Sequence, residues 1–218
     1  MTEFFDLLRP DERASLEAVG RRERYPRGAI IFREGSPSAS VIIVVSGRVK
    51  VSSDTATGIE VVLAVRGPGA LLGEFSAIDG APRSATVSAL EPVTALAVPS
   101  VEFERHLHTN PRVAVVLMKE LIRRLRDADR KRIEFGAFDT TGRVAARLVE
   151  LADRFGEQTD EGLRINLPLS QDELAGWTGS SREAVTKALR TLRDEGCIRT
   201  GRLRVVVTDL ESLRARAG

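Results

Sequence analysis

The C-terminal part of the fold is decided by residues 167–196, LPLSQDELAGWTGSSREAVTKALRTLRDEG. Ser170 precedes Glu173 by three residues, which is the spacing of a capping box at the start of a helix. Gly179 stands where the chain must turn with a positive φ, and Ser181 can cap a second helix. The stretch therefore predicts two short helices joined by a tight turn, a helix-turn-helix.

The second of these helices has an apolar face and a polar face. Val185, Ala188 and Leu189 recur at helical spacing and are expected to point inward. The residues left on the outward face are Arg182, Glu183, Thr186, Lys187 and Arg190.

The outward side chains have the chemistry for reading DNA bases. Arginine can donate two hydrogen bonds to guanine, glutamate can accept one from the cytosine amino group, and lysine can reach a second guanine. We therefore expect Arg182, Glu183 and Lys187 to contact DNA, with the caps Ser170 and Ser181 at the same surface. An ordinary helical hairpin is the alternative.

The next stretch, GCIRTGRLRVVVTD (196–209), predicts a two-stranded wing with Arg199, Arg202 and Arg204 near the DNA phosphates. Between Arg182 and Arg204, seven basic residues are opposed by three acidic ones, although the whole chain has a formal net charge of only +2. Taken alone, this charge is equally explained by a solvated helix face.

Composition indicates a folded protein of two domains. The chain has 218 residues, of which 42% are hydrophobic and 29% charged, as in globular proteins. No signal peptide or membrane-spanning stretch is evident, so we expect a cytoplasmic protein with no membrane partner.

The single cysteine, Cys197, is expected to be a buried structural thiol. His106 and His108 are expected to be exposed loop residues, and no metal site is predicted.

From Arg21 to Pro99, short runs rich in Val and Ile alternate with turn residues: AIIF, SVIIVVSG, RVKVSS, IEVVLAV and SATVSAL. This spacing is typical of an antiparallel sandwich or barrel. The apolar residues before Arg21 fit helical turns that could cap one end of it.

A long helix is predicted after Asn110 and Pro111, which suit an N-cap and a first helical position. One stripe carries apolar residues every four positions: Val113, Leu117, Leu121 and Leu125. A long charged helix with one narrow apolar seam favours pairing with its own twofold copy. Packing of the stripe against the β domain is the alternative.

The pattern breaks at Asp139, a good N-cap for a further helix. We therefore predict a β domain at 1–109, a dimerisation helix at 110–138 and a winged helix-turn-helix domain at 139–218. Because the chain must change direction between two helices, Asp139 and Gly142 are predicted to form a hinge.

A second constellation lies in LLGEFSAIDGAPRSATVSAL (71–90), where Gly73, Glu74, Arg83 and Ser84 stand between two β runs. A helical turn beginning near Glu74 would offer backbone N–H groups to an anion, and arginine supplies a forked cation for phosphate. The carboxylate fits a ligand that also carries a sugar hydroxyl. An internal Glu74–Arg83 salt bridge explains the same residues without a ligand.

The chain resembles the cyclic-AMP receptor protein (CRP/FNR) family over almost its whole length. The resemblance is carried by YPRGAIIFREG (25–35), VSGRVKV (45–51), GEFSAIDGAPRSATV (73–87), FDTTGRVAARL (138–148) and SREAVTKAL (181–189). It implies an α+β protein with a jelly-roll cyclic-nucleotide-binding barrel, a long dimerisation helix and a winged helix-turn-helix.

The resemblance also implies roles for single residues. Glu74 would bind the ribose hydroxyl, and Arg83 and Ser84 the phosphate. The same turn would be lined by Gly73 and Phe75, and the base would be walled by Val51 and Leu63. The recognition helix would read a TGTGA-like half-site in an inverted repeat.

The sequence departs from the family pattern at Ala128 and Asp129, near the position where cAMP-responsive members offer a hydroxyl or amide to adenine. Ala128 cannot make that hydrogen bond, and Asp129 suits a base presenting donors, such as guanine, or faces solvent. Cyclic AMP is still the first expectation for the allosteric ligand, with cyclic GMP, another nucleotide or no ligand as alternatives. No other cofactor is required.

The expected function is thus a homodimeric transcription regulator that binds double-stranded DNA and contacts RNA polymerase. A constitutive DNA-binding regulator, whose β domain is structural or recruits polymerase, is the main rival. A regulatory subunit of another complex would leave the helix-turn-helix unexplained. An enzyme is not expected, because the chain has no nucleophile elbow, HExxH or Walker loop.

Overall fold

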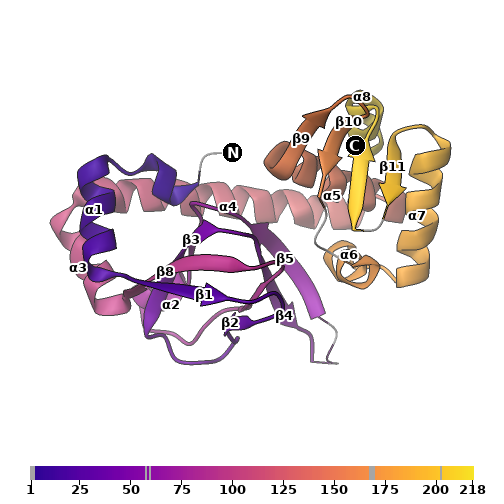
Figure 1. The fold of residues 1–218 in the computed structure, drawn as a ribbon. Coiled ribbons are helices and arrows are strands. Elements are labelled where there is room, and N and C mark those ends of the chain that lie inside the picture. The colour runs from indigo at the N-terminus through magenta and orange to yellow at the C-terminus, as the bar shows by residue number, and fades with distance from the viewer. Residues whose placement is uncertain (1–2, 57, 59, 167–169, 202) are drawn as a thin grey trace. The chain divides into compact units, whose positions relative to one another are not determined.

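The computed structural model describes residues 3–56, 58, 60–166, 170–201 and 203–218. Its contacts define two compact units: Thr2–Ser53 with Leu63–Asp127, and Asp54–Val62 with Ala128–Gly218. The division falls inside the long helix α4 (Pro111–Ala137), which is one unbroken helix (Figure 1). The predicted ranges 1–109, 110–138 and 139–218 stay a prediction.

The first unit is an antiparallel β domain with helices around it, as predicted. Its strands are β1 (Arg21–Tyr25), β2 (Ile30–Phe32), β3 (Ser40–Ser46), β4 (Val49–Asp54), β5 (Glu60–Arg66), β6 (Leu71–Leu72), β7 (Thr86–Ala89) and β8 (Val93–Pro99), except that Asp54 and residues 60–62 are counted with the other unit. They form two four-stranded sheets, in the orders β1-β8-β3-β6 and β2-β7-β4-β5. The helices are the 3-10 turn η1 (Phe4–Leu7), α1 (Pro10–Val19), α2 (Glu74–Asp79) and α3 (Ser100–Thr109).

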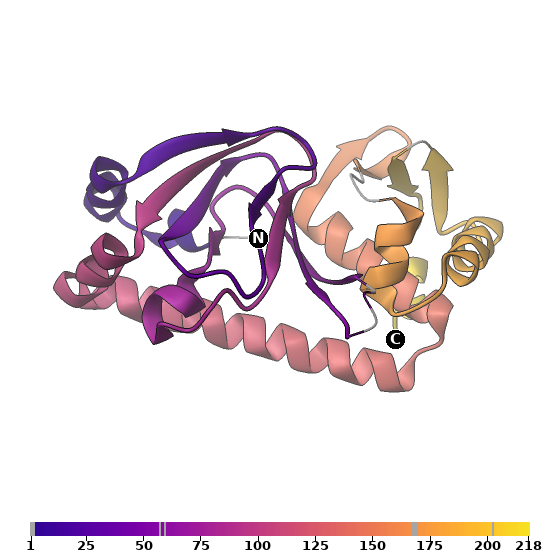
Figure 2. The same ribbon diagram turned by 90° about the horizontal axis from the view of Figure 1, so that it is seen from below.

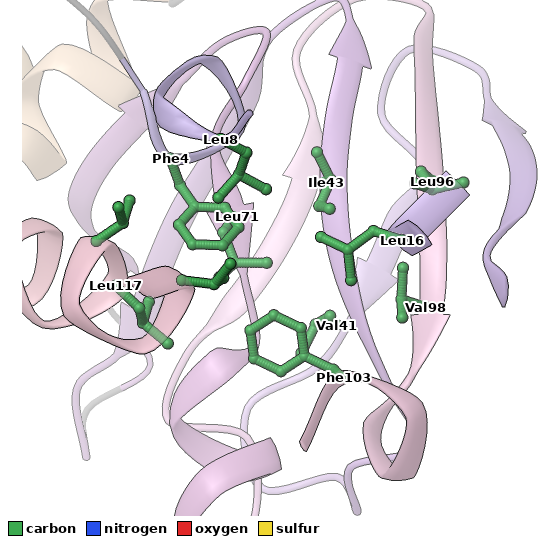
Figure 3. Close-up of a cluster of buried hydrophobic side chains, with 12 residues drawn as sticks. Phe4, Leu8, Leu16, Val41, Ile43, Leu71, Leu96, Val98, Phe103 and Leu117 are labelled. Carbon is green, nitrogen blue, oxygen red and sulfur yellow. The ribbon is translucent and has the colours of Figure 1, made fainter. Parts of the chain in front are cut away.

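Alternation along the central strand β3 gives the domain two cores. Ile42 and Val44 belong to a cluster inside the barrel, whereas Val41 and Ile43 point to the opposite face of their sheet. That outer face is covered by apolar side chains of the helices. Phe4 and Phe103 meet there edge to face, with ring centroids 6.4 Å apart (Figure 3). Helices α1 and α3 lie together at one end of the domain (Figures 1 and 2).

Helix α4 closes the outer core with the stripe that the sequence assigned to dimerisation. Val113 and Leu117 are fully buried in this core, and Leu121 packs against it. The assignment of these three residues to a dimer seam was therefore wrong, and the alternative of packing within the chain holds for them. Only Leu125 of that stripe is exposed. A four-residue repeat drifts around a helix with 3.6 residues per turn, so it cannot stay on one face.

A different apolar row on α4 faces away from the core. It consists of Val115, Met118, Ile122 and Leu125, which are 42%, 54%, 49% and 62% exposed. The spacing of three, four and three residues is that of the a and d positions of a coiled coil. We call these four residues the exposed seam.

The junction before α4 also differs from expectation. Asn110 does precede the helix, but its side-chain amide donates back to the His106 carbonyl, at 3.0 Å. His106 and His108 both lie within α3 and not in a loop, and His106 is buried. The expectation of two exposed histidines was thus wrong for His106, because α3 was not foreseen.

The second unit contains α5 (Thr140–Phe155), α6 (Gln171–Thr178), α7 (Arg182–Asp194) and α8 (Leu210–Arg216). Its strands β9 (Gly156–Thr159), β10 (Gly162–Ile165), β11 (Ile198–Gly201) and β12 (Arg204–Val207) form one antiparallel sheet in the order β11-β12-β10-β9. Strands β11 and β12 are the predicted wing. Cys197 is buried beside it, as expected. No helix among the described residues is long and apolar enough to cross a bilayer.

Trp177 of α6 fastens the helices of this unit to one another. Its buried indole ring lies 5.5 Å from Lys131 Nζ of α4 and 5.8 Å from Arg147 Cζ of α5. Arg147 also forms ion pairs with Glu134 of α4 and Glu150 of α5. These cation–π and ionic contacts join the last turns of α4 to α5 and α6.

The burial of His106 predicts a loss of stability in mild acid. Its Nδ1 lies 3.3 Å from Ser15 Oγ and from Asn110 Nδ2. Burial lowers the pKa of His106, partly opposed by Glu12. Stability is therefore fully present above the unfolded pKa of about 6.5 and is lost as the pH falls through the lower folded pKa.

Urea unfolding between pH 7.5 and pH 5 should show this decrease in the free energy of unfolding. His106→Gln should flatten the pH dependence, whereas His108→Gln, at a side chain 77% exposed, should leave it unchanged. An identical pH dependence in wild type and His106→Gln would contradict the assignment.

Candidate functional site

We call residues 71–90, the segment predicted to hold a ligand, the cassette. It is organised around two glycines with a left-handed backbone conformation. Gly73 (φ 79°) precedes the short helix α2, and Gly80 (φ 71°) follows it. The loop after α2 is tied to the chain before β3, because Arg83 N donates to Ser36 O at 2.9 Å and Gly35 N donates to Arg83 O at 2.8 Å. The backbone thus holds Glu74 and Arg83 at one place, as the sequence indicated.

Arg83 is almost completely buried, and its guanidinium faces the turn of the cassette. Nη1 donates to Gly73 O at 3.0 Å, Nη2 donates to Ser40 O, and the group stacks 4.3 Å above the Phe32 ring. A Cβ atom at Gly73 would lie 2.1 Å from Nη1, so only glycine fits beside this arginine. Burial lowers the pKa of Arg83, and Glu74 opposes that shift; arginine nevertheless stays charged.

One donor of this buried cation has no partner. Among the described residues, Arg83 Nε is buried and makes no hydrogen bond. A buried N–H of a charged group costs free energy unless an acceptor satisfies it. The arrangement therefore fits an anionic oxygen of a bound ligand, and a phosphate has the acceptor geometry that a guanidinium prefers.

Glu74 is buried with a different partner from the one considered in the sequence. Its Oε1 lies 2.6 Å from Arg124 Nη1 of α4, so the internal Glu74–Arg83 salt bridge is replaced by a Glu74–Arg124 pair. Burial raises the pKa of the Glu74 carboxyl, and the Arg124 guanidinium opposes this rise. Arg124 donates to Oε1, and a carboxylate has a second acceptor oxygen, Oε2, which suits a ligand hydroxyl.

Arg124 was not identified as a site residue from the sequence. It was one of many charges on a helix expected to face a partner. The signal that could have found it is its position one turn after Glu120 on the helix face that turns inward with Val113 and Leu117.

The other predicted ligand residues are less enclosed. Ser84 and Phe75 are exposed at the cassette, and Leu63 is 43% exposed on β5. Val51 packs against the core inside the barrel. Ala128 and Asp129 are both exposed on α4. Their roles in binding stay predictions.

The helix-turn-helix has the local geometry that its sequence predicted. Ser170 Oγ accepts from Glu173 N at 3.2 Å, while Glu173 accepts from Ser170 N at 2.7 Å, which completes the capping box. Gly179 is left-handed, with φ 58°. Ser181 Oγ accepts from Ala184 N at 3.2 Å and so starts α7.

The outward face of α7, predicted to read DNA, is exposed. Its outward side chains line one shallow hollow: Arg182, Glu183, Thr186, Lys187 and Arg190. Val185, Ala188 and Leu189 are buried behind them. Two residues of α6 reach this face, because Asp172 lies 3.6 Å from Arg182 and Gln171 Oε1 accepts from Thr186 Oγ1 at 2.9 Å. Helix N-terminal residues aimed outward in this way suit a major groove.

The wing supplies further cations. Arg199 and Arg204 are exposed on β11 and β12, and Arg193 Nη1 of α7 donates to Thr200 Oγ1 at 2.9 Å, which links helix and wing. Leu203 at the turn has a φ of 54°, unusual for a residue other than glycine. Arg202, predicted to contact DNA, lies outside the described residues.

The predicted hinge residues form a bonded turn. Asp139 caps α5 by accepting from Gly142 N at 2.7 Å. Arg143 ties the turn to α6, since it donates to Phe138 O at 2.7 Å and to Thr178 O at 2.8 Å.

Within the described residues no cluster of three potential metal ligands is present.

Comparisons with known proteins identify two domains in the chain. The model of the cyclic nucleotide-binding domain matches residues 22–110, and that of the Crp-like helix-turn-helix domain matches residues 142–216. The "CRP-like cAMP-activated global transcriptional regulator" of Mycobacterium tuberculosis is 33% identical over 98% of this chain and 95% of its own length. The "Cyclic AMP receptor protein" of Thermus thermophilus is 34% identical over 90% of this chain and 88% of its own.

Among solved structures, FixK2 from Bradyrhizobium japonicum shares the fold, with a TM-score of 0.82 at 23% identity over 92% of this chain and 98% of that one. The predicted fold class is confirmed. The matched relatives are named as regulators and not as enzymes, in agreement with the sequence. The chain therefore belongs to the CRP/FNR family of DNA-binding transcription regulators with a cyclic nucleotide-binding domain.

Proposed function

We propose that the protein is a homodimeric transcription regulator whose binding to an inverted-repeat, TGTGA-like operator is controlled by a cyclic nucleotide, with cyclic AMP as first choice. It acts in the cytoplasm and contacts RNA polymerase. The observation that carries ligand control is the buried Arg83 guanidinium with its unpaired Nε beside the Glu74 carboxylate. The relatives named as cAMP-activated support the choice of nucleotide.

In this proposal Arg83 and the exposed Ser84 hold the phosphate, and Glu74 Oε2 accepts from the ribose hydroxyl. Arg124 holds Glu74 in place and opposes the rise of its pKa. Val51 and Leu63 wall the base, while Gly73 and Phe75 line the turn. The ligand favours one arrangement of α4, and the turn at Asp139 and Gly142 transmits it to the recognition helices.

Ala128 supports a second candidate. It has no polar side-chain atom for adenine, and the neighbouring carboxylate of Asp129 is exposed and suits a base with donors. A regulator that responds to cyclic GMP or another nucleotide, or that binds DNA constitutively, is therefore the alternative. Isothermal titration with cAMP and with cGMP distinguishes these cases; no heat with either, and unchanged DNA affinity, selects the constitutive regulator.

Replacing Arg83 should separate ligand control from DNA binding. Arg83→Ala removes a buried cation, and charge-assisted hydrogen bonds contribute roughly 1.5–3 kcal/mol each, so nucleotide affinity should fall roughly 100-fold. Stimulation of DNA binding by the nucleotide should vanish, while binding without nucleotide should stay at the wild-type level.

Fluorescence anisotropy with labelled operator measures both quantities, and circular dichroism verifies folding. The control is Arg105→Ala, at an exposed arginine of α3 paired with Glu102. Full nucleotide stimulation in Arg83→Ala would reject the cassette as the ligand site.

The exposed seam is proposed to form the dimer. Ile122→Glu combined with Met118→Glu places charges at its centre, where burial of unpaired carboxylates is unfavourable. We expect dissociation to a monomer in analytical ultracentrifugation and loss of affinity for the inverted repeat. Val101→Glu, at an exposed apolar position of α3, is the matched control. A dimer of unchanged affinity in the seam variant would refute this interface.

If α7 reads DNA bases, substitutions at two of its arginines should have different effects on DNA binding. Arg182→Ala should cost about 1–3 kcal/mol per half-site and relax selection at one base pair. Arg190→Ala, farther along the same face, should weaken binding to all sequences alike and reduce the salt dependence by about one phosphate contact. Anisotropy titrations against a library of single-base operator variants, at several salt concentrations, test this; uniform weakening by Arg182→Ala would contradict base reading.

A further inference from the structure

A carboxylate is buried in the apolar face of α4. The side chain of Glu120 is 1% exposed, although it lies one turn from Val116 and Leu117, which are core residues. Burying a carboxylate costs several kcal/mol unless it is paired and hydrogen-bonded. An apolar residue would pack at this position without that cost. The burial of a carboxylate here therefore indicates a role in the neighbouring ligand site.

Glu120 is paired with two arginines of its own helix. Arg123 donates bidentately to it, with contacts of 2.9 Å to Oε2 and 2.6 Å to Oε1, and Arg124 Nε lies 2.9 Å from Oε1. Burial alone would raise the pKa of Glu120, but these hydrogen bonds hold it below its usual value. The carboxylate is therefore ionised and sets the position of both cations.

Arg124 is held at three points. Its Nε bonds Glu120, its Nη1 bonds Glu74 Oε1 at 2.6 Å, and its Nη2 donates to Leu71 O at 2.9 Å. Because a guanidinium is planar and rigid, three anchors fix both its plane and its rotation. The position of Glu74 Oε1 is fixed in turn, and rotation of the carboxylate about its last bond is restricted.

We infer that Glu120 is a positioning residue for the ligand site. Through Arg124 it orients Glu74 so that Oε2 faces the ligand hydroxyl, and it thereby makes the site select ribonucleotides over 2′-deoxyribonucleotides. The inference rests on the proposed binding of a cyclic nucleotide, and it adds a residue of α4 that makes no ligand contact itself.

The test compares two ligands that differ by one hydroxyl. Wild type, Glu120→Gln and Arg124→Lys are titrated calorimetrically with cAMP and with 2′-deoxy-cAMP, and with the two corresponding guanine nucleotides. Wild type should prefer the ribonucleotide by roughly tenfold or more, the value of one hydrogen bond to a charged group. Glu120→Gln should lower ribonucleotide affinity and leave deoxyribonucleotide affinity unchanged, so that most of the preference disappears.

Arg124→Lys keeps the positive charge but cannot span Glu120, Glu74 and Leu71 together. It should lose the preference to the same extent, and it provides the same test if Glu120→Gln does not fold. Adding Glu120→Gln to Arg124→Lys should have no further effect on the preference. Glu104→Gln, at a carboxylate 58% exposed on α3, should keep wild-type affinities. Without ligand, the melting temperature should fall by a few degrees in Glu120→Gln and stay unchanged in Glu104→Gln.

The outcomes separate two failures. Equal loss of affinity for both sugars, or an unchanged preference in both variants, overturns the role of Glu120 and leaves nucleotide binding standing. Binding of neither sugar by the wild type overturns the proposed function itself, and the positioning role with it.

Discussion

The ion pair between Glu74 and Arg124 is the contact on which much of the β domain depends. It joins the cassette to helix α4, and both side chains are largely buried, where an unpaired charge is unfavourable. Arg124 is in turn held by Glu120, and Arg83 occupies the opposite side of the same turn. Residues of α4, as well as residues of the barrel, therefore fix the geometry of the cassette. Its geometry depends on where α4 lies against the sheet, and hence on the packing of Val113 and Leu117.

Helix α4 shows why periodicity alone misplaced the dimer seam. An apolar residue every fourth position predicts one stripe, yet the stripe winds around the helix, and its first members are used by the core of the same chain. The residues left outside follow a three-and-four spacing. Sequence also placed Arg123 and Arg124 on a generic charged face. Long-range packing against the barrel decided which of these charges became buried, and the helical pattern gives only the face on which each of them lies.

Features set by local chemistry were predicted well. The capping box at Ser170, the positive φ at Gly179 and the caps at Ser181 and Asp139 each follow from one side chain and its neighbours within three residues. The strand runs of the barrel and the short helix at Glu74 were also found from composition. Helix α3 and strands β9 and β10 were missed, and the burial of His106 followed from the missed helix. The contact of Glu74 with Arg124 spans fifty residues, so it could not be read from the cassette alone.

Trp177 is the only tryptophan of the chain, and it lies where α4, α5 and α6 meet. Indole emission is sensitive to nearby charge, and here the ring has Lys131 on α4 and Arg147 on α5 as neighbours. The protein thus carries an intrinsic fluorophore at the base of its DNA-reading element. Any rearrangement of these helices on binding nucleotide or DNA would change the emission of a single, assigned residue, so that the movement can be followed in solution without an attached dye.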